Sequence, residues 1–263
     1  MLAFLRSIRR KNLKDSKLRG YLVYAIGEIV LVVLGILIAL SINNYNEGLK
    51  RKDKELEILK QLKDEFKLNQ SQLEEKILMR NEGLEAASQI LSYFDNKQTF
   101  DEAGFYQALW KLVRDPTFDP IENDIVGTEN LRMLTNAEII QQLSRWSSDV
   151  YQVQELELEY QKFRSSQLSP KLNALGLGRN LQNELWKNGY TPLEALDKSA
   201  NYKQNIGESH SKINYDKVLR DVELEGMVAT SITFHRITNL QSDYLRNVIA
   251  KTLELIDSEI ERF

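Results

Sequence analysis

The 263-residue sequence contains no cysteine, only four prolines and only two histidines. Without cysteine the chain forms no disulfide and offers no thiolate, an absence that fits either side of a membrane. Few prolines and only twelve glycines leave few helix breakers. Leu, Glu, Lys and Gln, which lose little side-chain freedom in a helix, are abundant instead. The composition therefore predicts an all-α fold.

The sequence also lacks the motifs that usually carry catalysis. His210 and His235 have no partner at metal-binding spacing, and HExxH, GxSxG and GK[ST] are all missing. Glu155, Glu157 and Glu159 occupy alternate positions of a predicted helix, so their side chains point in different directions around its axis. We expect them to be exposed to solvent, since the two carboxylates of a glycosidase must converge in a cleft. We expect no enzymatic activity, no cofactor and no metal. A net charge of −3 does not indicate the basic surface that nucleic-acid binding requires.

One stretch, residues 21–42, is almost entirely apolar, and Glu28 is its only charged residue. As a helix it rises about 33 Å, enough to cross a hydrocarbon core of about 30 Å. Tyr21 and Tyr24 lie at one end and Tyr45 at the other, where interfacial aromatic residues are typical. These features predict a transmembrane helix that contacts the lipid bilayer.

Two alternatives to a transmembrane helix remain. A buried core helix of a soluble domain is rarely this long with a single charge. A cleaved signal peptide has a shorter apolar run, usually 7–15 residues, and a shorter basic lead than this chain. The only small-x-small cleavage candidate, Ala39-Leu40-Ser41, is weak.

The two flanks of the apolar stretch differ in basic charge. Asp15 is the only acid among the N-terminal basic residues, which are Arg6, Arg9, Arg10, Lys11, Lys14, Lys17 and Arg19. The C-terminal flank mixes Lys and Arg with acids over residues 47–57. By the positive-inside rule the N-terminus is cytoplasmic, and the domain is periplasmic if the membrane is a cell inner membrane. The basic arm, residues 1–20, is either an amphipathic helix on the anionic leaflet or a disordered topogenic segment.

Glu28, Gly35 and Ala39 fall on one face of the predicted transmembrane helix. Gly35 and Ala39 form a small-xxx-small pair, which lets two helices approach closely. An ionised carboxylate inside a membrane is costly and usually meets a partner, water or an ion path. Three interpretations stay open: Glu28 snorkels to the interface, it belongs to a helix contact, or it carries protons.

The residues after the apolar stretch predict a long helix over residues 43–95. Apolar residues recur in steps of three and four, while Asn69 and Arg80 fill polar positions of the same stripe. The apolar members are Leu59, Leu62, Phe66, Leu73, Ile77, Leu84, Ala87, Leu91 and Phe94. The stripe fits either bundle packing within one chain or a coiled coil between chains.

Residues 96–263 complete the predicted domain with further helices. We expect Asp101 to cap a short helix and Asn136 to cap a longer one over residues 137–166, ended by Pro170. Residues 167–220 look irregular. A last helix over residues 222–263 carries a stripe of Leu224, Val228, Ile232, His235, Leu240, Leu245, Val248, Leu253, Ile256 and Ile260. The predicted architecture is an elongated antiparallel bundle in which the first and last long helices pair.

Two stretches resemble a family of uncharacterised single-pass bacterial membrane proteins. Residues 21–47 contain YAIGEI, an aliphatic run with a glycine, and ALSINNYNE, followed by a charged helix; residues 127–143 read GTENLRMLTNAEIIQQL. Tyr45 stands where the family often has tryptophan. The resemblance implies an anchor followed by a helical extracytoplasmic domain, and it implies no activity.

Three functional hypotheses follow. The first is a membrane-anchored interaction or scaffold subunit that forms a homo-oligomer or joins a membrane complex. The second is an extracytoplasmic ligand-binding or sensory module, although about 20 cytoplasmic residues leave no room for a signalling domain. The third is an accessory of an ion-coupled membrane machine that uses Glu28.

Overall fold

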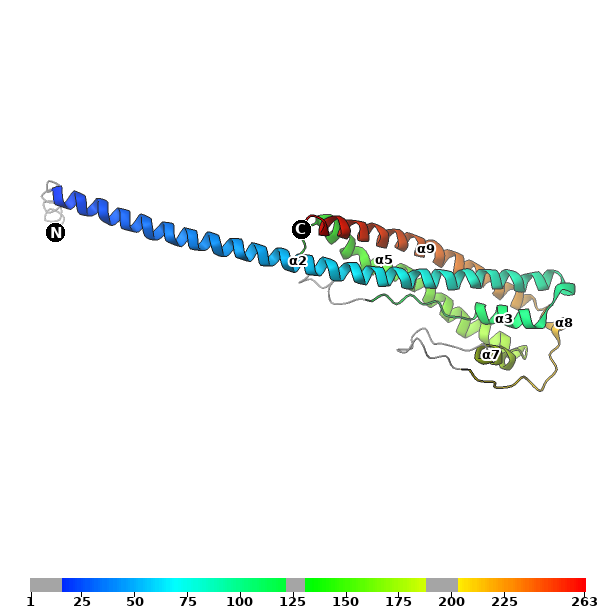
Figure 1. Ribbon diagram of the computed structural model, residues 1–263. Coiled ribbons are helices and arrows are strands. Elements are labelled where there is room, and N and C mark those ends of the chain that lie inside the picture. Colours follow the sequence, from blue (N-terminus) through cyan, green and yellow to red (C-terminus); the bar gives the residue numbers. More distant parts are fainter. Residues whose placement is uncertain (1–15, 122–130, 188–202) are drawn as a thin grey trace, which may run out of the picture. The chain divides into compact units, whose positions relative to one another are not determined.

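The computed structural model describes residues 16–121, 131–187 and 203–263, with side chains from residue 22 onward. These residues are all-helical and contain no strand, which confirms the predicted fold class (Figure 1). The elements are α2 (Ser16–Asp95), η1 (Lys97–Thr99), α3 (Glu102–Leu112), α5 (Ala137–Phe163), η3 (Arg164–Leu168), α6 (Ser169–Ala174), α7 (Gly178–Lys187), α8 (Tyr215–Val218) and α9 (Val222–Ile260).

The chain divides into two compact units, Met1–Glu57 and Ile58–Phe263. In its described residues the first unit consists of the N-terminal part of α2. The second unit contains the rest of α2 and all the later helices. Residues 1–15 of the basic arm lie outside the described residues, and residues 16–20 form the start of α2.

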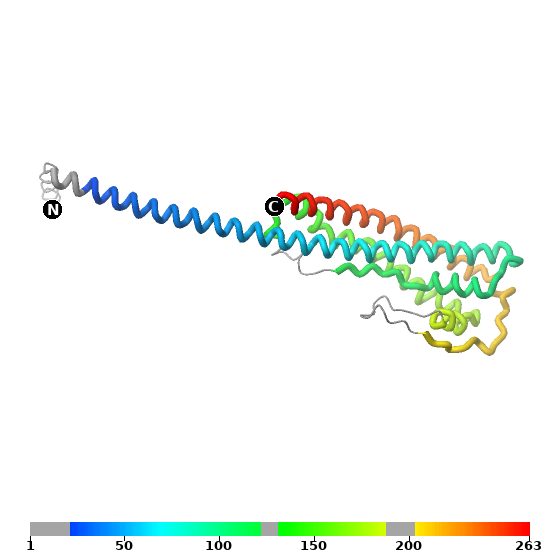
Figure 2. The backbone as a smooth tube through the Cα atoms, viewed as in Figure 1, coloured from blue at the N-terminus to red at the C-terminus, as the bar shows by residue number. Residues whose placement is uncertain are grey.

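In the second unit, α2, α5 and α9 lie side by side (Figure 2). Lys63 pairs with Asp257 at 2.5 Å and Glu74 pairs with Arg246 at 2.5 Å, so α9 runs antiparallel to α2. The predicted pairing of the first and last long helices is therefore confirmed. The ring of Phe66 packs on that of Trp146 at a centroid distance of 4.8 Å.

The helix α5 runs parallel to α2, because Phe66 meets Trp146 and, further along both helices, Arg80 meets Glu157. A parallel neighbour requires the chain to return along the bundle between the two helices. The chain returns first through α3 and then through residues 114–121, which are non-helical and which we call the strap. Relative to α2, therefore, α3 and α9 are antiparallel and α5 is parallel.

The two predicted helix caps, Asp101 and Asn136, are confirmed. Asp101 accepts a hydrogen bond from the Gly104 N–H at the start of α3, and Asn136 accepts from the N–H groups of Glu138 and Ile139 at the start of α5. These bonds satisfy N–H groups that have no partner within the helix.

Pro170 does not end the helix that precedes it, contrary to the prediction. The chain passes from α5 through the π-helical turn η3 into α6, and Pro170 lies in the first turn of α6. The π-helical turn η3, directly before Pro170, changes the backbone hydrogen-bonding pattern where proline supplies no N–H group. Residues 167–220 are also more regular than expected, because α6, α7 and α8 fall within them.

The predicted stripes identify most of the core but misplace one residue and miss five. Leu240 on α9 is 69% exposed, while Ile58, Ala86, Ile90 and Tyr93 on α2 and Ile249 on α9 are buried. The buried apolar residues form two clusters, one around Phe66 and Trp146 and one around α3 and the adjoining ends of α2, α5 and α9.

Candidate functional site

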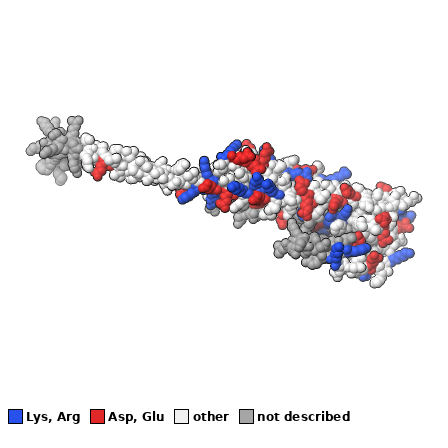
Figure 3. Space-filling view, in the orientation of Figure 1, with Lys and Arg blue, Asp and Glu red and all other residues white. Residues whose placement is uncertain are grey.

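The first candidate site is the apolar stretch of α2. This is the one helix in the described part of the chain that is long and apolar enough to cross a membrane, with a mean hydropathy of 2.7 and no buried residue in its apolar window. Figure 3 shows this stretch as white apart from a red acidic patch, whereas the second unit carries mixed charge. A helix that is apolar on every side needs an apolar environment.

The residues predicted for a contact face lie exposed on this stretch. Glu28, Gly35 and Ala39 are separated by seven and four residues, close to whole helical turns, so they share one face of α2. No side chain lies within 4 Å of a Cβ placed on Gly35. The face is therefore open to a partner helix or to lipid.

The predicted interfacial residues are placed only in part. Tyr24 and Tyr45 are exposed on α2. The side chain of Tyr21 lies outside the described residues. The predicted cytoplasmic basic residues, Arg6, Arg9, Arg10 and Lys11, also lie outside them.

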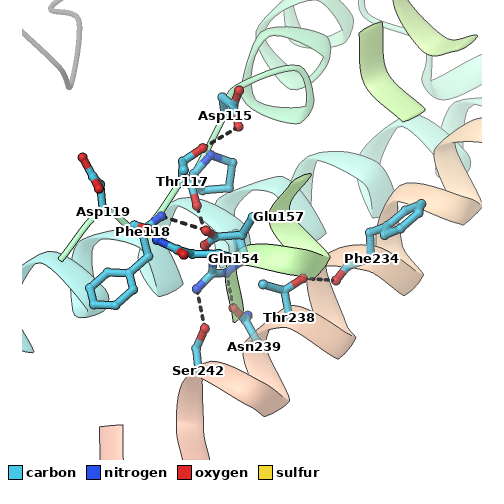
Figure 4. Close-up of polar contacts among 12 residues, drawn as sticks. Asp115, Thr117, Phe118, Asp119, Gln154, Glu157, Phe234, Thr238, Asn239 and Ser242 are labelled. Atoms are coloured by element: carbon cyan, nitrogen blue, oxygen red, sulfur yellow. Dashed lines mark hydrogen bonds and ion pairs between the residues drawn. The ribbon is translucent and has the colours of Figure 1, made fainter. Parts of the chain in front are cut away.

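The second candidate site is a buried polar network at the centre of the second unit (Figure 4). Arg80, on α2, is 1% exposed. Its Nη1 donates to Glu157 Oε1 of α5 at 2.5 Å, and its Nη2 and Nε donate to Ser242 Oγ at 2.7 Å and Asn239 Oδ1 at 2.8 Å, both on α9. One guanidinium therefore joins three long helices.

The strap completes this network. Arg80 Nη1 also donates to the carbonyl oxygen of Pro116 at 3.3 Å, and the second carboxylate oxygen of Glu157 accepts from the N–H of Phe118 at 2.8 Å. Both members of the ion pair thus hold the backbone of the strap. A buried pair of this kind needs such extra hydrogen bonds to offset its loss of hydration.

Burial sets the protonation behaviour of the pair. It raises the pKa of Glu157 to about 7, against the opposing effects of Arg80 and of the Phe118 N–H. Burial also lowers the pKa of Arg80, and the Glu157 carboxylate opposes that shift. Each partner therefore offsets part of the effect of burial on the charged form of the other.

His235 lies near the network on α9. Its ring is 3% exposed and packs against the ring of Tyr160 at a centroid distance of 4.5 Å. Burial, with Arg80 and Arg114 nearby, lowers the pKa of His235 to about 4. The neutral imidazole is the form that this position stabilises.

Glu157 is the residue that sequence analysis misplaced. Glu155 and Glu159 are exposed as expected, but Glu157 is buried on the opposite face of the same helix. Its position on α5, three residues before Tyr160 and four after Val153, places it among buried residues, and this spacing was the available signal. Arg80 was expected within the stripe of α2 and is found there.

The polar groups of the network bond mainly to each other and to the strap. Residues 16–121, 131–187 and 203–263 hold no cluster of three or more His, Asp or Glu side chains arranged for a metal. The nearest cavity, of about 640 Å³, lies between α2, the strap and α5 and is lined in part by Gln72, Phe118 and Leu158.

Comparison with known proteins supports an uncharacterised family. Residues 28–104, from Glu28 on the apolar stretch to the first turn of α3, match a family of unknown function, DUF6090. No curated protein and no solved structure matches the chain significantly.

Proposed function

We propose that this chain is a membrane-anchored, non-catalytic interaction subunit that self-associates or joins a membrane complex. The observation that carries the proposal is the fully exposed apolar stretch of α2, which presents Glu28, Gly35 and Ala39 on one face. Small residues permit close approach of a second helix, and a hydrogen bond between helices would satisfy the carboxyl group of Glu28.

The proposed location is a cell inner membrane, with the N-terminus in the cytoplasm and the second unit in the periplasm. The excess of basic residues before residue 21 supports this orientation. The resemblance of residues 21–47 to single-pass bacterial membrane proteins supports the compartment. The polar, mixed-charge surface of the second unit suits an aqueous space (Figure 3).

The test is the state of the full-length protein after gentle extraction. Tagged protein should sediment with membranes, resist an alkaline carbonate wash and be released by mild detergent. Two differently tagged copies, or one copy and a fixed partner, should then co-purify. A protein that stays in the soluble fraction, or that is extracted as a monomer without a partner, would overturn the proposal.

The position of Glu28 also supports an ion-coupled alternative, because a membrane carboxyl group is a common proton carrier. Glu28→Gln separates the two functions. Gln keeps a hydrogen-bonding side chain and cannot carry a proton, so association should persist under the interaction proposal. A dimer that persists while transport or motility in the host is lost would favour the ion-coupled function.

A further inference from the structure

The strap, residues 114–121 (RDPTFDPI), is a non-helical segment. No backbone–backbone hydrogen bond joins it to another described residue. Pro116 and Pro120 have no N–H group, and their rings restrict the chain to extended or turn conformations. The strap therefore enters the groove between α2 and α5 as an extended peptide.

Side chains of α5 bind one residue of the strap through both of its backbone polar groups. The N–H of Phe118 donates to Glu157 Oε2 at 2.8 Å, and Gln154 Nε2 donates to the Phe118 carbonyl oxygen at 3.2 Å (Figure 4). This bonding is independent of the Phe118 side chain.

Side chains of α2 bind the following residues in the same way. The N–H of Asp119 donates to Gln72 Oε1 at 3.1 Å. The amide of Asn69 makes two bonds with Ile121, accepting from its N–H at 2.7 Å and donating to its carbonyl oxygen at 3.2 Å. The side-chain amide of Asn69 thus pairs with the same two backbone groups that a neighbouring strand would bond in a sheet.

The side chains of the strap divide between buried and exposed positions. Phe118 is completely buried, and Pro116 and Pro120 are buried, while Thr117 and Asp119 are exposed. An extended peptide in a groove alternates in this way, with anchoring side chains directed inward and the others outward. Phe118 is the central anchor, because it belongs to the core cluster around Phe66 and Trp146.

We infer that the groove between α2 and α5 is a binding site for an extended peptide, and that the strap occupies it as an internal ligand. The external partner is a peptide with a large apolar side chain at the position of Phe118. It has backbone N–H groups at the positions of Phe118, Asp119 and Ile121, and proline is accepted at the positions of Pro116 and Pro120. Release of the strap makes the groove available to it.

Several contacts that hold α2, α5 and α9 together are made without the strap. The helix contacts Phe66–Trp146 and Glu74–Arg246 do not involve the strap. Arg80 also retains its bonds to Glu157, Asn239 and Ser242. The tethered strap competes at a high effective concentration, of millimolar order, so an external peptide binds weakly until the strap is displaced.

This inference deepens the proposed interaction function by naming a class of partner, and it rests on that function only for its biological setting. The two can fail separately. A monomeric protein that binds the peptide would refute self-association alone, and an oligomer that does not bind it would refute the peptide site alone.

The experiment uses full-length protein in mild detergent and a fluorescent peptide of residues 114–121. Phe118→Asp in the protein places a carboxylate in the apolar anchor site and should expel the strap. Ile121→Asp is the matched control, because the Ile121 side chain is exposed, its bonds to Asn69 are made by the backbone, and the strap should stay bound. Fluorescence anisotropy should show at least tenfold tighter peptide binding by Phe118→Asp than by the unaltered protein or the control.

Two further changes test where the peptide binds. A peptide whose phenylalanine is replaced by aspartate should not bind. Asn69→Leu, added to the Phe118→Asp protein, should weaken binding at least tenfold, since it removes both bonds to Ile121. A Phe118→Asp protein that keeps its helical circular dichroism and cooperative melting yet binds no peptide would overturn the inference.

Hydrogen exchange on the unaltered protein provides a test that does not depend on a variant folding. The N–H groups of Phe118, Asp119 and Ile121 should exchange through a local opening that leaves α5 and α9 protected. A large excess of the unlabelled peptide should speed their exchange by displacing the strap. Strap amides that exchange only together with the core of α5 and α9 would contradict the inference.

Discussion

Arg80 carries a charge in a site from which water is nearly excluded, and Glu157 is the carboxylate that neutralises it at 2.5 Å. Such a pair contributes little net stability compared with apolar residues of similar size, but loss of one member leaves a buried charge alone. We therefore expect Arg80→Met to lower the free energy of unfolding by about 3–5 kcal/mol. Urea denaturation followed by circular dichroism measures this change.

The double variant Arg80→Met with Glu157→Leu is the control for this prediction. It removes both charges, so it should recover a large part of the stability lost in Arg80→Met. Glu157→Leu also removes the acceptor of the Phe118 N–H, so recovery should be incomplete. If the two single losses simply add in the double variant, the pair is not the coupled unit described above.

His235 predicts a specific dependence of stability on pH. Burial lowers its pKa to about 4 from 6.5, so the unfolded chain takes up a proton at this residue before the folded one does. The stability contributed by neutral His235 is complete above pH 6.5 and is lost as pH falls through about 4. The loss amounts to about 3 kcal/mol and should be absent in His235→Phe.

Titration of Glu157 changes the stability in the opposite direction, so the measurement must separate its effect from that of His235. Its pKa in the folded protein is raised to about 7 from 4.5, so its contribution is complete below pH 4.5 and is lost as pH rises through about 7. The two effects partly cancel between pH 4.5 and 6.5. The informative quantity is therefore the difference between the unaltered protein and His235→Phe at each pH, and a difference that is independent of pH would refute the prediction.

At the scale of helices, α2 and α9 approach each other closely at Gly83. A Cβ at this position would lie 2.8 Å from His235 Nε2 and 3.1 Å from its Cδ2, and the His235 ring is confined against Tyr160. Overpacking of this kind typically costs about 1–3 kcal/mol, more than the gain of about 1 kcal/mol in helix propensity. Gly83→Ala should therefore lower the thermal midpoint.

Gly226 provides the matched control for this prediction. It lies inside α9, and nothing is within 4 Å of a Cβ placed there. Gly226→Ala should therefore raise the thermal midpoint, because only the helix propensity changes. If both substitutions stabilise the protein, the α2–α9 contact at Gly83 is looser than the distances indicate.

The elements themselves were largely predictable because their signals are local. Asp101 and Asn136 cap the helices that they precede, and the spacing of apolar residues on α2 identifies its buried face through Phe66 and Ile77. Leu240 followed the same periodicity and is exposed, since periodicity gives the face of a helix but not the edge at which its neighbours end.

The network and the strap were not predictable from local signals. In the sequence, 77 positions separate Arg80 from Glu157, and 162 positions separate Arg80 from Ser242. Contacts over such separations follow from the packing of whole helices. The strap contains two prolines and one phenylalanine, and only the parallel arrangement of α2 and α5 shows that this short sequence must return through the core.

At the scale of the whole molecule, the chain combines a first unit suited to an apolar environment with a second unit whose surface is charged. The same helix, α2, contributes to both units. Over residues 22–42 it has exposed apolar residues on every side, and in the second unit it has a buried apolar face and a polar face. Association within the membrane would therefore depend on residues that have no part in folding the second unit.

This separation permits a test of the membrane contact face that leaves the second unit intact. Gly35→Leu fills the proposed close contact and should weaken self-association about tenfold, a change of about 1.4 kcal/mol in the range reported for membrane helix contacts. Gly27→Leu is the matched control. It adds the same side chain to the same helix, but Gly27 lies about 100° from Glu28 around the helix axis. Cross-linking of two tagged copies in native membranes measures both variants. Equal yields from Gly35→Leu and Gly27→Leu would show that the face of Glu28, Gly35 and Ala39 is not where the copies meet.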